Sequence, residues 1–273
     1  MHRRLLPVAL SLLLAGGAHA QDASSIPAPR DVAYAPGTIR LDIDATNLNQ
    51  RIFKVRQTIP VQSGPLTLLY PAWVPGGHSP RGAIDKIAGL TFKAGDRKLE
   101  WKRDTLNVHA FHLDVPQGVS QITAEFDFLT ATGSGQGRVV MTPRMLNLQF
   151  LSTVLYPAGH YAGKIMFDPR VTYPAGWTAF TALHEQGRSG DTVDYQDVPL
   201  DILVDSPVYA GRHAKNIDLT PAGSKVPVRL GVVADAAKFL EAKPAQVAIH
   251  KAMVEQTLKL FGAQHYEIGR AHV

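Results

Sequence analysis

Apolar and polar residues alternate with a period of two along most of the chain before residue 222. Ile39, Leu41 and Ile43 share one phase of the first such segment, and charged residues share the other. The pattern recurs at 53–59, 66–70, 90–92, 99–101, 111–115, 122–128, 146–150 and 165–167, with Gly, Pro or Asp between the segments. Such alternation predicts half-buried antiparallel strands, and two stacked sheets would bury their apolar faces. We therefore expect a mostly β fold, an antiparallel β-sandwich over 38–222.

The pattern changes near Ala222. One more alternating strand is expected to end near Ala234, and helical spacing follows it. Pro244 suits the first turn of a helix and Gly262 suits its end. Four apolar residues would share one face of this helix: Val247, Val254, Leu258 and Phe261. A strand followed by a helix predicts that 223–267 begin a second, α+β domain.

The amino terminus has the three parts of an export signal. Arg3 and Arg4 precede an apolar stretch, and Ala18-His19-Ala20 is a cleavage site of the Ala-x-Ala type. We expect 1–20 to be a signal peptide, 21–37 a flexible leader, and the protein to be periplasmic or secreted. No later segment has the roughly 20 consecutive apolar residues of a membrane span.

Composition narrows the chemistry. The chain has no cysteine, so disulfides, thiolate metal ligands and a cysteine nucleophile are excluded. The formal charge of +5 falls by two without Arg3 and Arg4, and the basic residues are scattered. This distribution does not predict a nucleic-acid partner.

Histidine motifs for a metal are incomplete. A zinc-peptidase helix needs His-Glu-x-x-His, whereas the only His-Glu pair, His184-Glu185, has Arg188 at the last position. Gly187 and Gly190 favour an exposed turn there. His109 and His112 have a spacing that metal ligands sometimes use, but on a strand such a pair points to opposite faces. We interpret them as ordinary strand histidines.

Other catalytic patterns are equally weak. The Gly-rich segment 133–137 lacks the Lys-Ser/Thr of a phosphate-binding loop and is interpreted as a flexible connection. No Gly-x-Ser-x-Gly elbow is present. Asp201 and Asp205 could pair as in a glycosidase, but we expect both to be solvated.

The segment 70–82 is the most distinctive, because prolines and glycines define its backbone around a tryptophan. Trp73 has a large apolar surface to bury. His78 and Arg81 would be held in fixed positions. We expect these three residues either to face a substrate cleft or to support the loop.

Trp73-Val74-Pro75-Gly76 resembles the Trp-x-Pro-Gly signature of the amino-terminal domain of the glycyl-aminopeptidase family, the zinc metallopeptidases of family sixty-one. The similarity spans about 39–211 and continues in four further segments: Ile87-Ala88-Gly89-Leu90, Trp101-Lys102-Arg103-Asp104, Phe111-His112 with Val115-Pro116-Gln117-Gly118, and Leu203-Val204-Asp205-Ser206-Pro207-Val208. One departure is Gly77-His78, where many members have a small residue and then tyrosine.

The resemblance implies an exported enzyme of three parts: a β-sandwich, a thermolysin-like zinc domain with His-Glu-x-x-His and a downstream glutamate, and a PDZ domain. None of its zinc ligands or catalytic residues maps onto this sequence. The chain is thus expected to be an inactive amino-terminal fragment without a cofactor of its own. Zinc, peptide substrates, and the catalytic and PDZ domains in cis would belong to the full-length parent.

The last six residues, Ile268 to Val273, can be encoded by ATC GGA AGA GCA CAC GTC, which is similar to the start of a common sequencing adapter. We hypothesise that 268–273 are a non-native tail. The alternative to a peptidase fragment is a complete, non-catalytic periplasmic β-sandwich that binds peptide or glycan.

Overall fold

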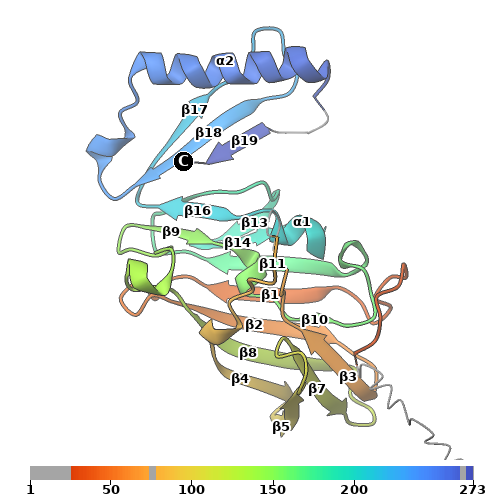
Figure 1. The fold of residues 1–273 in the computed structure, drawn as a ribbon. Helices are drawn as coiled ribbons and strands as arrows, with labels where there is room; N and C mark the ends of the chain where they lie inside the picture. Colours follow the sequence, from red (N-terminus) through yellow and green to blue (C-terminus); the bar gives the residue numbers. More distant parts are fainter. Residues whose placement is uncertain (1–25, 74–77, 265–268, 273) are drawn as a thin grey trace, which may run out of the picture.

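A computed structural model describes residues 26–73, 78–264 and 269–272 of the chain. Expectations for the signal peptide, for the first part of the leader (21–25), for Val74 to Gly77, for His265 to Ile268 and for Val273 therefore lie outside the described residues. The described part is mostly β, as the alternation predicts (Figure 1).

The largest sheet has nine strands in the order β13-β14-β11-β1-β2-β8-β4-β5, and β15 pairs beside β11. Its strands are β1 (Ile39–Asp44), β2 (Ile52–Pro60), β4 (Ile87–Ala94), β5 (Arg97–Leu99), β8 (Gln121–Leu129), β11 (Met166–Thr172), β13 (Glu185–Ser189), β14 (Thr192–Tyr195) and β15 (Val198–Pro199). The sheet is mixed, because β1 and β11 run parallel. The other pairs of this sheet are antiparallel, as expected for the sandwich.

Two smaller sheets complete the sandwich. One contains β10 (Tyr156–Pro157), β3 (Gly64–Leu69), β7 (Ala110–Val115) and β6 (Trp101–Arg103), and the other contains β12 (Thr178–Phe180), β16 (Val208–Gly211) and β9 (Met145–Leu148). All three sheets supply side chains to one buried hydrophobic cluster, including Leu41, Phe111 and Leu148. Burial of these alternating apolar faces is the main favourable contribution to folding.

Short helical segments connect the strands. The α-helix α1 spans Leu200–Val204, and 3-10 turns occupy Ile84–Lys86, Ser134–Gln136, Phe150–Ser152, Ala162–Lys164 and Ala237–Leu240. Asp201 lies in α1 rather than in a loop, and it is exposed like Asp205, as expected for solvated carboxylates.

The segment predicted to be a flexible leader contacts the sandwich in its second half. Arg30 N donates to Gly159 O at 3.2 Å, and Tyr34 N donates to Lys164 O at 2.9 Å. The Tyr34 hydroxyl also donates to Pro60 O, and the Tyr34 ring packs edge-on against His160. These hydrogen bonds attach 30–34 to the sandwich.

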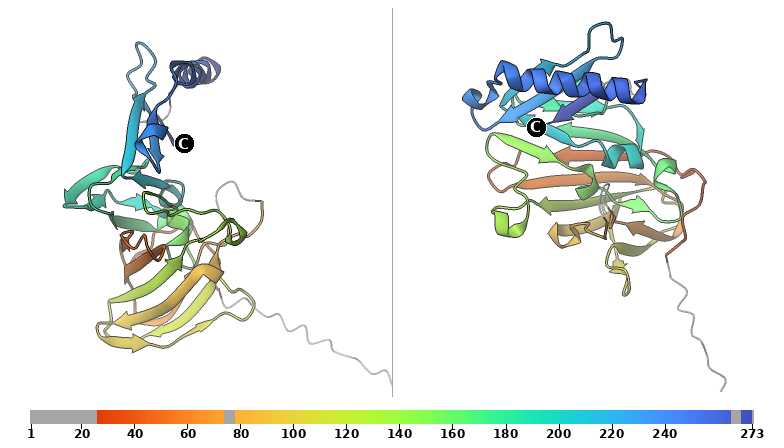
Figure 2. Two further views of the ribbon diagram at one scale, coloured as in Figure 1. Left: turned by 90° about the vertical axis from the view of Figure 1, so that its left-hand side faces the viewer. Right: turned by 45° about the horizontal axis from the view of Figure 1, so that its top comes forward.

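Beyond the sandwich, β17 (His213–Asp218), β18 (Val228–Ala234) and β19 (Gly269–His272) form a separate sheet, and α2 (Pro244–Phe261) lies across one of its faces (Figure 2). Pro244 begins α2 and Gly262 ends it in the left-handed region at φ 70°. Val254 is buried against Leu219, Val228 and Leu230. Phe261, expected on the same face, is 70% exposed.

The chain passes from the sandwich into this separate sheet at Arg212. Before it, β16 pairs with β9, and after it β17 pairs along its whole length with β18. The proposed domain boundary at 222 stays a prediction, as does the non-native origin of 268–273. In the described part of the chain, no helix is long and apolar enough to cross a membrane.

Candidate functional site

The loop predicted to hold a site has a closed base. Arg81 N and Gly82 N both donate to Ala72 O, at 2.8 and 2.9 Å, so the two ends of the loop meet. A Cβ on Gly82 would lie 1.8 Å from the Pro71 carbonyl oxygen. Only glycine therefore fits where the chain leaves the loop.

Tyr70 anchors the entry to this loop. Its side chain is 1% exposed, and its ring stacks on His109 with centroids 6.0 Å apart at an interplanar angle of 17°. Tyr70 N donates to His109 O at 2.8 Å. Burial raises the pKa of the Tyr70 hydroxyl far above its ordinary range, so this group stays a neutral donor.

The three predicted site residues are solvent-facing. Trp73 is 64% exposed, so the described residues of this chain do not bury it as we expected. His78 is also exposed. Arg81 Nε donates to Ser79 Oγ at 3.0 Å, which is the loop-supporting bond that we considered. Of the three, Arg81 alone lines a hollow.

This hollow, which we call the basic pocket, has a volume of about 300 Å³. It lies between the loop base, the 3-10 turn after it, and the ends of β2, β8 and β9. The pocket is lined by Phe53, Arg81, Ala83, Lys86, Phe128, Thr130, Ala131, Arg138, Val140, Asn147, Gln149, Leu151 and Ser152. Three of these residues are cations and none is an acid.

His109 and His112 have separate surroundings and share no hydrogen-bond partner among the described residues. His112 lies on β7, where Nε2 is 2.8 Å from Asp104 Oδ2 and Nδ1 is 3.0 Å from Thr67 Oγ1. His109 lies in the turn before β7, because Asn107 Oδ1 accepts a hydrogen bond from its backbone N–H at 3.0 Å. The strand interpretation is thus correct for His112 and wrong for His109.

The His109 ring is poorly suited to carry a charge. Its Nδ1 is buried and has no hydrogen-bond partner among the described residues. Burial, with a smaller contribution from the charge of Arg103, lowers the pKa of His109. The ring is neutral near pH 7 and acts as an aromatic surface for Tyr70.

The only His-Glu pair does not form a metal site. Glu185 begins strand β13, so the expected turn is replaced by a bulged strand, and the turn comes at Gly190. Glu185 accepts two hydrogen bonds from Arg188, the residue that stands where a zinc peptidase has its second histidine. Within 26–73, 78–264 and 269–272, no three His, Asp or Glu side chains lie together as metal ligands. The described residues thus do not fit a zinc ion.

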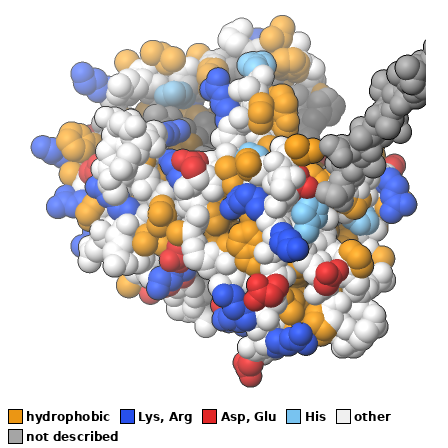
Figure 3. All heavy atoms as spheres, turned by 60° about the horizontal axis from the view of Figure 1, so that its bottom comes forward, with side chains coloured by type: hydrophobic (Ala, Val, Ile, Leu, Met, Phe, Trp, Pro, Cys, Tyr) orange, Lys and Arg blue, Asp and Glu red, His pale blue; other side chains and the backbone are white. Residues whose placement is uncertain are grey.

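The outer face of the large sheet carries matched charges. One row across five strands alternates in sign, in the order Asp194, Arg170, Asp42, Arg56 and Glu125. This row borders a shallow hollow of about 560 Å³. On the face that Figure 3 shows, Lys and Arg side chains likewise lie among Asp and Glu.

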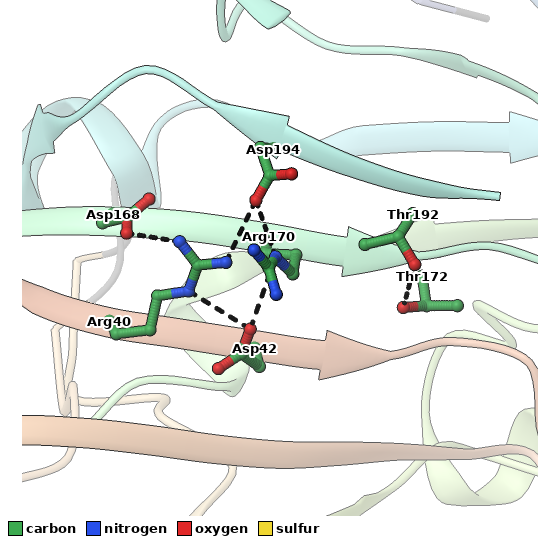
Figure 4. A network of polar contacts seen from close by, with 7 residues as sticks. All are labelled: Arg40, Asp42, Asp168, Arg170, Thr172, Thr192 and Asp194. Atoms are coloured by element: carbon green, nitrogen blue, oxygen red, sulfur yellow. Dashed lines mark hydrogen bonds and ion pairs between the residues drawn. The ribbon is translucent and has the colours of Figure 1, made fainter. Parts of the chain in front are cut away.

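Arg40 is at the centre of this charged network, between carboxylates from three strands (Figure 4). Its guanidinium donates to Asp168, to Asp194 Oδ1 at 3.0 Å and to Asp42 Oδ1 at 3.2 Å. Asp194 also accepts from Arg170 Nε at 2.6 Å. The hydrogen bond from Arg170, followed by that from Arg40, lowers the pKa of Asp194. We interpret the network as stabilisation of the sheet face.

Sequence patterns did not identify most of the basic pocket. Lys86 and Arg138 stand in unrelated segments, and only the pairing of β4 with β8 and the turn at 134–136 brings them together. Lys86 Nζ donates to Gln136 O at 3.2 Å, which links the two segments directly. The Gly-rich segment is therefore a 3-10 turn attached to the pocket wall.

Comparison with known proteins agrees with the fold. Residues 40–212 match the peptidase M61 N-terminal domain, and the chain belongs to this family. No curated protein matches the chain.

Solved structures resemble it at low sequence identity. An aminopeptidase N family protein from Idiomarina loihiensis aligns with a TM-score of 0.70 and 17% identity, over 85% of this chain and 38% of that one. An M1 zinc metallopeptidase from Deinococcus radiodurans aligns with a TM-score of 0.49 and 13% identity, over 91% of this chain and 57% of that one. The chain thus spans well under two thirds of either protein.

Proposed function

We propose that this chain is the amino-terminal part of an exported, zinc-dependent aminopeptidase and has no peptidase activity by itself. The match of residues 40–212 to the peptidase M61 N-terminal domain carries the proposal. The aminopeptidase name of the Idiomarina protein, which shares the fold, supports peptide hydrolysis as the activity of the parent.

Two features of the sequence support export and the absence of peptidase activity in the chain by itself. The first twenty residues have the charged, apolar and Ala-x-Ala parts of a cleavable signal, which favours export. The 273 residues contain no His-Glu-x-x-His. A zinc ion that lowers the pKa of its bound water would need ligands from further sequence.

The sandwich would then serve as a supporting domain. The family match begins one residue into β1 and ends at residue 212, so β17, β18 and α2 lie beyond it. In our proposal, residues 223–267, which contain β18 and α2, are the first part of the catalytic domain, and β17 pairs with β18 in one sheet. This sheet is joined to the sandwich by a single residue, Arg212, between β16 and β17.

Extension of the gene tests the proposal. The natural reading frame after residue 267 should encode a His-Glu-x-x-His, and the protein expressed from it should bind one zinc and release glycine or alanine from short peptides. Replacement of the motif glutamate by glutamine should abolish hydrolysis and retain the zinc. A natural stop codon soon after residue 267 would contradict the proposal and favour a peptide- or glycan-binding module.

A further inference from the structure

The basic pocket gathers cations from three separate segments. Arg81 comes from the end of the loop, Lys86 from the 3-10 turn after it, and Arg138 from the chain that follows the 134–136 turn. Arg81 and Arg138 are exposed, and Lys86 is half-buried. Like charges held near one another repel, so an anion among them would be stabilised.

These cations have no acidic partners. Among the described residues, none of the three forms an ion pair, and the acid beside Lys86 in sequence, Asp85, does not line the pocket. The outer sheet face differs, because Arg40 and Arg170 there contact carboxylates directly. The three pocket cations thus differ from Arg40 and Arg170, because no carboxylate among the described residues forms an ion pair with them.

The rest of the lining is apolar, apart from the amides of Asn147 and Gln149 and the hydroxyls of Thr130 and Ser152. Phe53 and Phe128 form a buried floor, and Val140 and Leu151 are half-buried beside it. Gln149 Nε2 donates to Asn147 Oδ1 at 2.8 Å, and Asn147 Nδ2 donates to Val208 O at 3.2 Å. These bonds fix both amides at the pocket wall.

A ligand that fits this lining has a carboxylate beside an apolar group. The volume of about 300 Å³ is at the small end of ligand pockets and suits one or two amino-acid residues. An arginine guanidinium binds a carboxylate through two parallel hydrogen bonds. A free phosphate would use the cations but leave the apolar wall uncovered.

We propose that the basic pocket binds the carboxyl-terminal residue of a short peptide, with its α-carboxylate at Arg81, Lys86 and Arg138 and its apolar side chain against Val140 and Leu151. The choice of a peptide rests on the proposed peptidase function. The carboxylate-plus-apolar chemistry rests on the pocket alone.

Calorimetric titration of the full chain with N-acetyl-Ala-Phe and with its carboxyl-terminal amide tests this proposal. The free acid should bind at least about tenfold more tightly than the amide, because the amide has no charge to pair with the arginines. Arg138→Gln and Arg81→Gln should each lower the affinity for the free acid by about fivefold or more. Arg97→Gln, on the exposed β5 hairpin, is the matched control and should leave the affinity unchanged.

Several results would overturn the proposal. These are equal affinity for acid and amide, absence of binding by the folded wild-type chain, loss of affinity in Arg97→Gln equal to that in Arg138→Gln, or inorganic phosphate binding as tightly as the peptide. Circular dichroism of each variant establishes folding. This test and the test of the proposed function have separate outcomes. This chain can fail to bind the acid while the extended protein hydrolyses peptides. It can also bind the acid while the extended protein hydrolyses no peptide.

Discussion

Gln57 and Leu155 exchange two hydrogen bonds inside the core. Gln57 Nε2 donates to Leu155 O at 2.9 Å, and Leu155 N donates to Gln57 Oε1 at 2.7 Å. The Gln57 side chain is completely buried on the inner face of β2. One amide thereby satisfies both backbone groups of a residue that lies between strands, where no sheet partner reaches it.

Replacement of this amide should be costly. Gln57→Met keeps the shape but leaves the N–H and C=O of Leu155 buried without partners, which should lower the free energy of unfolding by about 2–4 kcal/mol. Urea denaturation measures the change. Gln121→Met, at the exposed start of β8, is the matched control and should change stability by less than about 0.5 kcal/mol. Equal effects of the two variants would contradict the structural role of Gln57.

The strand pattern could be predicted from sequence because burial on a sheet has a period of two. β1, β2, β7 and β8 occupy the expected segments. Gln57 shows a limit, because it stands in the apolar phase of β2 although it is polar. A polar residue in the apolar phase indicates a buried hydrogen bond. The partner could not be predicted, because Leu155 lies 98 residues away in the sequence.

The pairing of strands and the composition of the basic pocket depend on contacts between residues that are far apart in the sequence. Leu99 and Trp101 alternate as one strand in the sequence, yet β5 and β6 belong to different sheets, and Glu100 separates them. Arg81 could be singled out because its own loop is distinctive. Lys86 and Arg138 could not, since neither has a local pattern that differs from ordinary surface residues.

The loop base gives a prediction about Gly82. Gly82→Ala places a Cβ against the Pro71 carbonyl, a backbone atom that cannot rotate away, so we expect a loss of about 3 kcal/mol. Thermal and urea unfolding measure the loss. Gly133→Ala is the control, because a Cβ there meets nothing within 4 Å. If both variants were equally stable, the closed loop base would be wrong.

The sheet of β17, β18 and β19 packs on the sandwich where Gly231 of β18 meets Phe180 of β12. A Cβ on Gly231 would lie 2.6 Å from Phe180 Cγ. Gly231→Ala should therefore destabilise the protein by about 1–3 kcal/mol. In the Phe180→Ala background the same change should cost at least about 1 kcal/mol less, which a double-mutant cycle measures. Strict additivity of the two changes would show that these residues are not in contact.

The charged network predicts a dependence on pH. The pKa of Asp194 is lowered by Arg170 and Arg40, so its contribution to stability is present above the ordinary aspartate pKa of about 3.9. The contribution is lost as the pH falls through the lower folded value. Asp194→Asn should cost up to about 1 kcal/mol at pH 7, and the difference from wild type should shrink below pH 3.9.

Urea denaturation from pH 7 to about pH 2.5 follows this difference. Asp96→Asn, in the exposed turn between β4 and β5, is the matched control and should show little effect at pH 7. A cost of Asp194→Asn that does not change with pH would show that the carboxylate charge is not the source of the stabilisation.

The most direct test of the central claim is zinc content and peptidase activity measured on this 273-residue chain and on the protein from the extended gene. We predict that the folded chain retains no stoichiometric zinc after dialysis and does not cleave glycyl or alanyl peptides, while the extended protein does both. Stoichiometric zinc and cleavage by the chain alone would contradict the account, because its described residues contain no group of ligands that fits the metal.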